Sequence, residues 1–311
     1  MSLLISADFM PEERVLWDEA LQVVLPGEDW VRAGEAFDRD QVEVAIVANP
    51  RPGSLQGLAN LKLIQSLWAG VDRLLLDPTL PADVPLARLV DPAMNQAMAE
   101  TALWAVLSLH RGFFAYAQQQ RELNWAQLTQ RRADEIRVLV LGLGQMGGTV
   151  AQRLAYNGYR VTGWSRHAAQ VPGVTCRHGE DELGELLAKA QIVVNLLPLT
   201  PATTGLFNAR TFSAMPRGAS LVNLARGAHV VESDVIAALD SGQLAHAVLD
   251  VFSHEPLPTE NPLWRHPRVT VLPHVAALTD PRSAAAVAAA NVHAVRAGRP
   301  LQHLVDRARG Y

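Results

Sequence analysis

The clearest indication of the fold is one segment near the middle of the chain, Val138-Leu139-Val140-Leu141-Gly142-Leu143-Gly144-Gln145-Met146-Gly147. It opens with an apolar run of strand length and continues directly into the pattern G-x-G-x-x-G. A helix is expected to follow, because Met146, Val150 and Leu154 recur at four-residue intervals and Gly158 is typical of a helix end. A strand, a glycine-rich turn and a helix in this order predict a Rossmann-type dinucleotide-binding unit.

Each glycine of this pattern has its own expected task. Gly142 permits the tight turn, Gly144 lets the backbone approach a pyrophosphate, and Gly147 lets the helix pack closely on the sheet. The helix begins with Gln145 and Met146, where free N–H groups and the helix dipole favour phosphates. A glycine-rich turn that binds no ligand is the alternative interpretation.

The end of the next predicted strand indicates which dinucleotide is bound. NAD-binding units usually carry an acidic residue about 20 residues after the glycines, which accepts hydrogen bonds from the ribose hydroxyls. This chain instead reads Gly163-Trp164-Ser165-Arg166. Ser165 can donate to a 2′-phosphate and Arg166 can pair with it, so NADP(H) is the preferred cofactor, with NAD(H) as the second option. A solvated surface charge is the other interpretation of Arg166.

Outward from this motif, short apolar runs alternate with amphipathic stretches along nearly the whole chain. Continuous apolar runs that are each followed by a helix predict parallel sheets covered on both faces. The predicted strands of the first series are Leu3–Ser6, Val44–Ala48, Leu61–Leu67 and Leu86–Val90. Those of the second series are Ile136–Leu141, Tyr159–Trp164, Gln191–Leu196, Ser220–Ala225, Ala247–Val251 and Val269–Leu272. We therefore expect an α/β protein with two Rossmann-like, doubly wound domains.

Two domains are also the default for 311 residues, because single cores stop growing at roughly 250–300 residues. A predicted helix, Asp91–Arg111, lies between the two strand series. Its second half is apolar nearly all round, so we expect it to be buried between the domains. An alanine-rich helix from Pro281 to about Ala297 follows the last strand.

The composition, 49% apolar and 19% charged, is that of a folded globular protein and argues against disorder. A formal net charge of −4 predicts no general attraction to nucleic acid or to an anionic membrane. Cys176 is the only cysteine, which excludes an intramolecular disulfide and a cysteine metal cluster. Without a basic leader or an apolar stretch of membrane-spanning length, a cytoplasmic location is expected.

Three polar residues follow strands of the second series. Arg226 comes after the fourth strand, Glu255 after the fifth and His274 after the sixth. Because open parallel sheets bind ligands at the carboxyl ends of their strands, we expect the three side chains to face one crevice. Taken singly, each has an ordinary alternative as a surface charge, a loop acid or a turn residue. Their joint occurrence after a dinucleotide motif favours catalysis.

Reduction of a 2-keto acid requires these residue types. A histidine titrates near neutrality, so it can hold the proton that the carbonyl oxygen receives. A carboxylate hydrogen-bonded to the imidazole fixes its tautomer and stabilises its charged form. A guanidinium can grip the substrate carboxylate with planar, directed donors, while a nicotinamide supplies the hydride.

These residues resemble the D-isomer-specific 2-hydroxyacid dehydrogenase family, and the resemblance covers nearly the whole chain. The matching segments are Leu141–Gly147, Leu197–Thr200 with Thr203, Asn223–Gly227, Leu249–Pro258, Pro273-His274 and, near the N-terminus, Ala69–Asp72. The resemblance implies that Arg226, Glu255 and His274 are the catalytic set, with His274 as the general acid/base.

The resemblance also implies which residues bind the ligands. The backbone N–H groups of Ala69, Gly70 and Val71 would help to hold the substrate carboxylate. Trp68 and Trp264 could narrow the substrate pocket so that only small acids fit, although tryptophans of this kind more often pack in the core. The residues implied to bind the cofactor are Leu197, Pro198, Thr203, Leu224, Ala225 and, beside the nicotinamide amide, Asp250.

Within the family, the glyoxylate/hydroxypyruvate reductase branch is the most similar. The segments that carry this similarity are Trp164–Arg166, Asn223–Gly227, Glu255–Pro258, Pro262–Trp264 and Val305–Tyr311. The chain departs from the family where the usual acid after the second strand of the nucleotide domain is absent. It departs again where Asp72 is followed by Arg73-Leu74-Leu75 and not by the frequent Asn-Ile-Asp.

The family's architecture implies a flavodoxin-like substrate domain at residues 1–91 and 285–311, split by an inserted NAD(P)-binding domain at residues 92–284. Related enzymes pair through the cofactor domain, so a homodimer is implied, and the apolar helix Met94–Leu109 fits that role. The D configuration of the product also comes from the resemblance alone.

The sequence thus predicts NADPH-dependent reduction of a small 2-keto acid, such as glyoxylate or hydroxypyruvate, to the D-2-hydroxy acid. Two alternatives stay open. One is a dehydrogenase of the same fold for another substrate, such as phosphoglycerate, formate or phosphite. The other is a binding protein that senses the dinucleotide without turnover. The expected partners are the small acid and a second copy of the chain, with no nucleic acid, membrane or metal.

Overall fold

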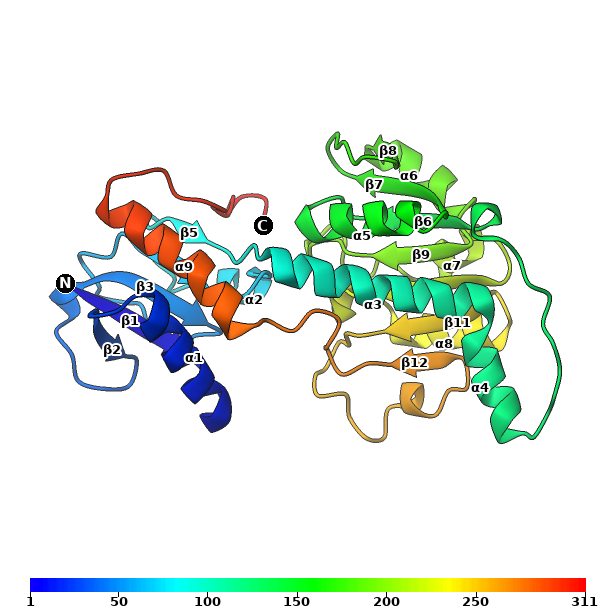
Figure 1. Ribbon diagram of the computed structural model, residues 1–311, viewed down its shortest axis with the longest axis horizontal. Coiled ribbons are helices and arrows are strands. Elements are labelled where there is room, and N and C mark those ends of the chain that lie inside the picture. The colour runs from blue at the N-terminus through cyan, green and yellow to red at the C-terminus, as the bar shows by residue number, and fades with distance from the viewer. The chain divides into compact units, whose positions relative to one another are not determined.

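The computed structural model describes residues 1–311, and the chain divides into two compact units (Figure 1). Unit 1 comprises Met1–Ala93 and Thr279–Tyr311, and unit 2 comprises Met94–Leu278. The division after Leu278 differs from the expected boundary after residue 284, which falls inside helix α9 (Pro281–Arg296). Helix α9 therefore lies wholly in unit 1, and the chain crosses over just before it begins.

Unit 1 is built on a five-stranded sheet of order β2-β1-β3-β4-β5, in which every pair of neighbours is parallel. This is the flavodoxin-like strand order. The strands are β1 (Ser2–Ala7), β2 (Asp29–Arg32), β3 (Val42–Ala48), β4 (Leu63–Ser66) and β5 (Leu86–Ala87). The helices are α1 (Pro11–Val24), the short α2 (Asp72–Leu75) and α9, with a 3-10 turn η1 (Arg39–Gln41).

Polar contacts tie the C-terminal part of the chain into unit 1. Helix α9 packs against α1, and Asn291 on it donates to the buried Gln65 at 2.7 Å. Arg296 donates to Glu43 at 2.7 Å and also pairs with Glu28. Burial acts to raise the pKa of Glu43, but hydrogen bonds from Arg296 and Lys62 outweigh it and lower that pKa overall. The last helix is therefore an integral part of the first unit.

Unit 2 is built on a seven-stranded parallel sheet of order β12-β11-β10-β9-β6-β7-β8. The direction of strand addition reverses between β6 and β9, which is where doubly wound sheets bind dinucleotides. The strands are β6 (Arg137–Leu141), β7 (Arg160–Ser165), β8 (Thr175–His178), β9 (Ile192–Asn195), β10 (Ala219–Asn223), β11 (Leu244–Leu249) and β12 (Val269–Val271).

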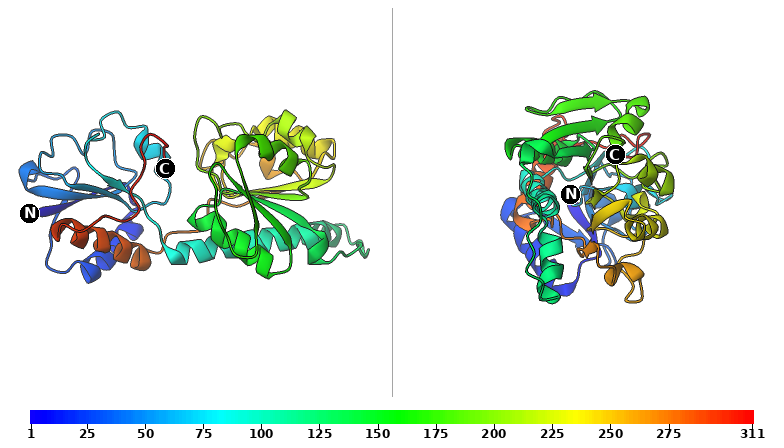
Figure 2. Two further views of the ribbon diagram at one scale, coloured as in Figure 1. Left: turned by 90° about the horizontal axis from the view of Figure 1, so that it is seen from above. Right: turned by 90° about the vertical axis from the view of Figure 1, so that its right-hand side faces the viewer.

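Helices cover both faces of this sheet, as Figure 2 shows. Successive strand residues alternate between two cores: Val138 and Val140 pack with α3 and α5, whereas Leu139 and Leu141 pack with α6, α7 and α8. The helices are α3 (Pro92–Arg111), α4 (Phe113–Arg121), α5 (Gln145–Tyr156), α6 (Glu180–Leu187), α7 (Ala209–Ala214) and α8 (Glu232–Asp240). The 3-10 turns are η2 (Ala133–Glu135), η3 (Gly227–His229) and η4 (Pro262–Trp264). Two doubly wound α/β units confirm the predicted fold class.

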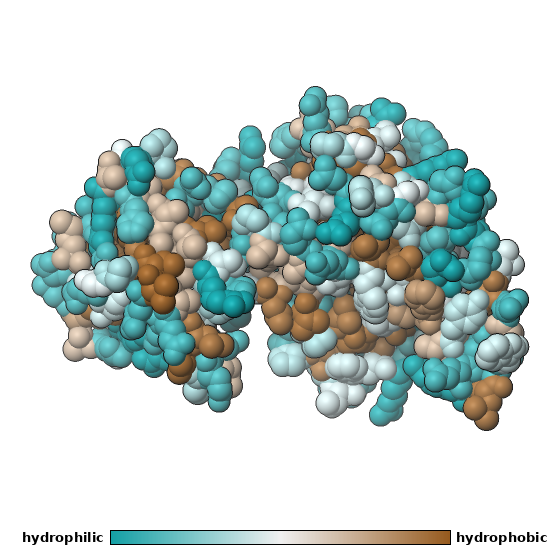
Figure 3. Space-filling view, viewed as in Figure 1, coloured by the Kyte–Doolittle hydropathy of each residue, from teal (hydrophilic) through white to brown (hydrophobic).

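Helix α3 corrects one expectation, because its second half is not buried all round. Ala102, Ala105 and Val106 are fully buried against the unit 2 sheet, but Trp104 is 42% and Leu107 39% exposed. Small residues on the packed face let the helix approach the strands, and the larger apolar residues are left on the opposite face. Hydrophobic side chains are visible among polar ones where α3 lies (Figure 3). No helix of the chain combines the length and apolar character that crossing a bilayer requires.

Candidate active site

The three predicted catalytic residues follow three strands that are neighbours in the unit 2 sheet. Arg226 lies just past β10, Glu255 in the loop after β11, and His274 just past β12. All three strands are parallel, so these loops leave the same edge of the sheet. The strand order thus places the three loops side by side.

His274 and Glu255 form a direct pair. The imidazole Nδ1 lies 2.7 Å from Glu255 Oε2, and Glu255 Oε1 accepts from the backbone N–H of Phe252 at 2.8 Å. A carboxylate only accepts, so the hydrogen of the neutral imidazole resides on Nδ1 and Nε2 is the nitrogen that gains or loses a proton. The side chain of His274 is 53% exposed, which leaves Nε2 accessible to a ligand. The pair is therefore arranged for acid/base chemistry.

The backbone at His274 is held in a conformation that favours glycine, with φ +56°. Its N–H donates to the carbonyl oxygen of Asp250 at 2.9 Å. The buried carboxylate of Asp250 then accepts from the N–H groups of Val275 at 2.7 Å and Ala276 at 3.0 Å. Asp250 thereby fixes the loop that presents the imidazole, a contact that sequence reasoning did not anticipate. Its predicted place beside the nicotinamide amide stays a prediction.

Gly227 explains how the Arg226 loop meets the Glu255 loop. A Cβ atom added at Gly227 would lie 1.9 Å from the carbonyl carbon of Phe252 and 2.4 Å from the backbone N of Ser253. Only glycine permits this approach of the two backbones. Arg226 itself is extended and partly buried, and its Nη1 donates to the carbonyl oxygen of Ala225 at 2.7 Å.

The glycine loop after β6 has the close contacts expected of a nucleotide-binding turn. A Cβ at Gly147 would lie 1.6 Å from the carbonyl oxygen of Gly142, and one at Gly142 would lie 2.6 Å from that of Leu196. A Cβ at Gly144 would meet nothing within 4 Å, so the space in front of the turn is open. The N–H groups of Gln145 and Met146 donate no hydrogen bond within the chain. Free donors at a helix start suit a pyrophosphate.

The residues predicted to read the dinucleotide lie at the ends of β7 and β9. Ser165 ends β7 and donates to the carbonyl oxygen of His167 at 2.7 Å, while Arg166 is exposed. After β9, Thr203 Oγ1 donates to the carbonyl oxygen of Pro198 at 2.8 Å and so closes the loop that carries Leu197. In this chain the Thr203 hydroxyl shapes the loop. Leu197, Leu224 and Ala225 are buried, and Pro198 is partly so.

The predicted substrate residues lie in unit 1, in the loop after β4. Trp68 packs edge-to-face against Trp17 and Phe9, with ring centroids 6.0 and 6.4 Å apart. Its buried Nε1 has no hydrogen-bond partner in the chain. The N–H groups of Ala69, Gly70 and Val71 donate to no group of the chain either. Consecutive unused donors are what a carboxylate requires.

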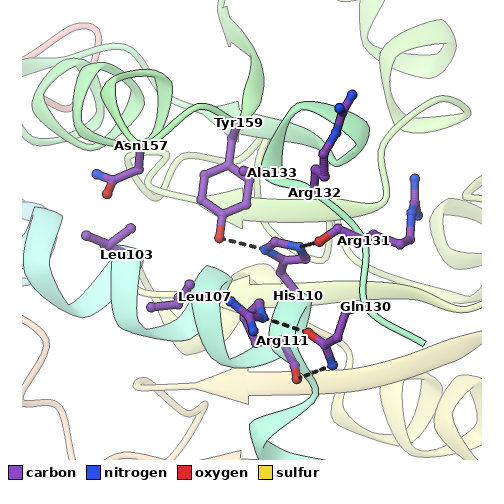
Figure 4. A pocket seen from close by; sticks show the side chains of 10 residues that line it. All are labelled: Leu103, Leu107, His110, Arg111, Gln130, Arg131, Arg132, Ala133, Asn157 and Tyr159. Carbon is purple, nitrogen blue, oxygen red and sulfur yellow. Dashed lines mark hydrogen bonds between the residues drawn. The ribbon is translucent and has the colours of Figure 1, made fainter. Parts of the chain in front are cut away.

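A separate pocket of unit 2, of about 410 Å³, contains none of the predicted residues (Figure 4). It lies beside the second half of α3, with Leu103 and Leu107 on its wall. The His110 ring in it lies 3.1 Å from the Tyr159 hydroxyl and 2.7 Å from the carbonyl oxygen of Arg131. Burial raises the pKa of Tyr159 to about 12. The polar groups of this pocket form hydrogen bonds with one another, which indicates that they stabilise the fold and do not bind a ligand.

Sequence reasoning missed a buried polar cluster made by Asn195, Asn223 and His229. A signal was present: Asn195 and Asn223 each end an apolar strand, and they are partners in the β9–β10 register. A polar residue in the same place on two adjacent buried strands indicates a shared hydrogen-bonding task.

The doubly wound unit 2 with its glycine loop is the fold of a dehydrogenase that uses a nicotinamide dinucleotide. Residues 103–276 match the family model described as D-isomer specific 2-hydroxyacid dehydrogenase, NAD binding domain. This chain belongs to the D-isomer-specific 2-hydroxyacid dehydrogenase family.

Solved structures of relatives agree over the full length of the chain. A D-isomer specific 2-hydroxyacid dehydrogenase from Xanthobacter autotrophicus Py2, in complex with NADPH and MES, is 43% identical, with a TM-score of 0.95 and coverage of 100% of this chain and 99% of that one. The NADPH-dependent glyoxylate/hydroxypyruvate reductase of Sinorhizobium meliloti, with NADP and sulfate, is 35% identical, with a TM-score of 0.92 and 100% of both chains covered. A probable 2-hydroxyacid dehydrogenase from Rhizobium etli CFN 42, with NADP, HEPES and L(+)-tartaric acid, is 33% identical, with a TM-score of 0.93 and coverage of 100% and 99%.

Proposed function

We propose that this enzyme reduces small 2-keto acids, glyoxylate and hydroxypyruvate among them, to D-2-hydroxy acids with NADPH as the reductant. The observation that carries the proposal is the 2.7 Å contact between His274 and Glu255 at the carboxyl edge of a dinucleotide-binding sheet. The similarity to the Sinorhizobium meliloti reductase supports the choice of substrates. The D configuration follows the family.

In the proposed reaction, His274 gives the proton on Nε2 to the carbonyl oxygen of the keto acid and afterwards regains one from solvent. When bound, the reduced nicotinamide supplies the hydride that the carbonyl carbon receives. Glu255 keeps the imidazole oriented and stabilises its positive charge before the transfer. Arg226 is assigned to the substrate carboxylate and to polarising the carbonyl. The role of the Ala69, Gly70 and Val71 N–H groups in holding a substrate carboxylate stays a prediction from the family resemblance.

The preference for NADPH rests on the end of β7, where Ser165 and Arg166 replace an acid that would repel a 2′-phosphate. The NADP(H) bound in three similar structures supports this assignment. The lining of the cofactor site is assigned to Leu197, Pro198, Thr203, Leu224 and Ala225, with Asp250 toward the nicotinamide amide.

We extend the proposal to a cytoplasmic homodimer that pairs through unit 2. The exposed Trp104 and Leu107 of α3 give this surface an apolar stripe, and Leu123 and Trp125, in the segment after α4, are 94% and 98% exposed. Exposed apolar residues that neighbour one another, as Trp104 and Leu107 do three positions apart on α3, are typical of an association surface. The single cysteine supports a reducing location.

A panel of 2-keto acids assayed with NADPH and with NADH tests the proposed function. We expect oxidation of NADPH upon addition of glyoxylate or hydroxypyruvate, and a kcat/KM at least about tenfold higher with NADPH than with NADH. The variant Arg166→Ala should lower that ratio, while Arg160→Ala, an exposed arginine at the other end of β7, should leave it unchanged. Tight NADPH binding without turnover of any keto acid would instead indicate a dinucleotide sensor.

A further inference from the structure

Three polar side chains that are 0% exposed form a hydrogen-bonded cluster at the carboxyl ends of β9 and β10. Asn195 Nδ2 donates to Asn223 Oδ1 at 2.9 Å and lies 2.9 Å from Nδ1 of His229. His229 Nε2 lies 3.3 Å from the carbonyl oxygen of Pro198. Because water does not reach these atoms, each must be satisfied by the others or by the backbone.

The backbone fixes the orientation of both amides. The N–H of Leu197 points at Asn195 Oδ1 at 3.2 Å, and the N–H of Ala225 points at Asn223 Oδ1 at 3.3 Å. A flipped amide would place its own N–H groups against these donors, so only the orientation seen in the structure lets each asparagine pair.

The orientation of Asn195 in turn fixes the tautomer of His229. Both hydrogens of Asn195 Nδ2 are used, one on Asn223 and one on the imidazole, so Nδ1 of His229 must accept. The ring hydrogen then resides on Nε2, where it donates to Pro198. A proton on Nδ1 would oppose the amide hydrogen of Asn195.

The cluster connects the loop that carries Arg226 with the loop that carries Leu197 and Pro198. The carbonyl oxygen of Arg226 accepts from Asn223 Nδ2 at 3.0 Å and from the backbone N–H of His229 at 3.2 Å. The imidazole of His229 therefore connects the two loops. Its Nδ1 reaches the Arg226 loop through Asn195 and Asn223, and its Nε2 faces the carbonyl oxygen of Pro198.

We propose that His229, as a neutral Nε2–H imidazole, is a positioning residue that holds the substrate-binding Arg226 and the cofactor-lining Pro198 loop in one fixed arrangement. This inference rests on the proposed function for the tasks of Arg226 and Pro198. His229 contacts neither ligand in this scheme, and its effect on the reaction passes through the two loops.

Three variants of His229 distinguish its Nδ1 contact, toward the Arg226 loop, from its Nε2 contact, toward Pro198. His229→Leu removes both hydrogen bonds and should lower kcat/KM for the keto acid about 10- to 100-fold while also raising the KM for NADPH. His229→Asn keeps an acceptor near the position of Nδ1, so it should restore most of the kcat/KM for the keto acid but not the KM for NADPH. His229→Gln keeps a donor toward Pro198 and should show the opposite split. Parallel loss of both parameters in all three variants would overturn the positioning role.

The tautomer of His229 is measured independently by nitrogen-15 NMR of the wild-type enzyme labelled at histidine, with His229→Asn used to assign the signal. We expect a ring with its hydrogen on Nε2, and this arm does not depend on whether the variants fold. A ring with its hydrogen on Nδ1 overturns the inference. Absence of keto-acid turnover by the wild-type enzyme refutes the proposed function, whereas wild-type turnover with unaltered His229 variants refutes the positioning role alone.

Discussion

At the scale of single residues, the candidate active site depends on polar groups that each form hydrogen bonds with specific partners. Asp250 illustrates this, because its two carboxylate oxygens hold the backbone on the far side of His274 and its carbonyl oxygen holds His274 itself. A left-handed backbone at a histidine costs roughly 1–3 kcal/mol and persists only when its surroundings impose it. The strain is located at His274, the residue to which we assign the proton transfer.

His246, on β11 of the unit 2 sheet, makes the free energy of unfolding depend on pH. Its ring stacks on Phe114 at 4.4 Å, and Nε2 lies 2.9 Å from the Thr270 hydroxyl. Burial, assisted by the positive charges of His266 and Arg268, lowers the pKa of His246 to about 4. The unfolded imidazole protonates near pH 6.5, so between these values the unfolded state binds more protons. The stabilisation is present above about pH 6.5 and is lost as the pH falls toward 4.

We therefore expect the free energy of unfolding to fall more steeply between about pH 7 and pH 5 in the wild-type enzyme than in His246→Gln, by about 1–2 kcal/mol. Glutamine keeps a polar group for Thr270 but does not titrate. Urea unfolding of both proteins at the two pH values measures the difference. Equal slopes would show that His246 is charged, or free to become so, in the folded state.

The residues that the sequence revealed are those whose chemistry is legible from type and position. Arg226, Glu255 and His274 were predicted because each follows a strand and each is ionisable. Asn195 and His229 were missed because their task is defined by partners distant in sequence, and an asparagine or a histidine in an apolar context has many ordinary explanations. Hydrogen-bond direction, which only coordinates supply, reveals the cluster.

At the scale of elements, the apolar runs predicted every strand except two. The missed strands, β2 and β8, both lie at the edge of their sheets, and most of their residues are partly or fully exposed. β2 and β8 are covered less and carry polar residues, so they lack the continuous apolar run that marks a buried parallel strand. The edge strands β5 and β12 keep such a run and were predicted. Helix α3 was predicted in place, but its degree of burial depends on which face meets the sheet.

The close contact between the loop after β10 and the loop after β11 can be tested by a single substitution. Gly227→Ala should force the Arg226 and Glu255 loops apart, because the new Cβ would overlap the backbone of Phe252. We expect a loss of about 1–3 kcal/mol in unfolding free energy and a strong fall in kcat/KM.

Gly184→Ala in α6 is the matched control for this change, since its Cβ would meet nothing within 4 Å and alanine favours a helix. Chemical unfolding and steady-state kinetics on the two variants check the prediction. If Gly227→Ala behaved like Gly184→Ala, the close approach of the two loops would not matter.

At the scale of the whole molecule, the proposed homodimer makes a prediction about mass. Light scattering coupled to size-exclusion chromatography should give twice the mass of the chain. Trp104→Glu places a charge in the apolar stripe of α3 and should weaken the dimer at least about tenfold. Val23→Glu, at a 79% exposed position of α1, should leave the mass unchanged. A monomer at every concentration of the wild-type enzyme would refute the proposed homodimer.

The doubly wound fold and the family both indicate a dehydrogenase that uses a nicotinamide dinucleotide. Proton transfer by His274 is the main step of the proposed reaction. Its most direct measurement is kcat with NADPH and glyoxylate or hydroxypyruvate for the wild-type enzyme and His274→Ala, together with the Kd of NADPH for both. If His274 donates the proton, kcat should fall by about 10²–10⁴ in His274→Ala while the Kd of NADPH stays the same. A kcat equal to that of the wild-type enzyme would rule out His274 as the general acid/base.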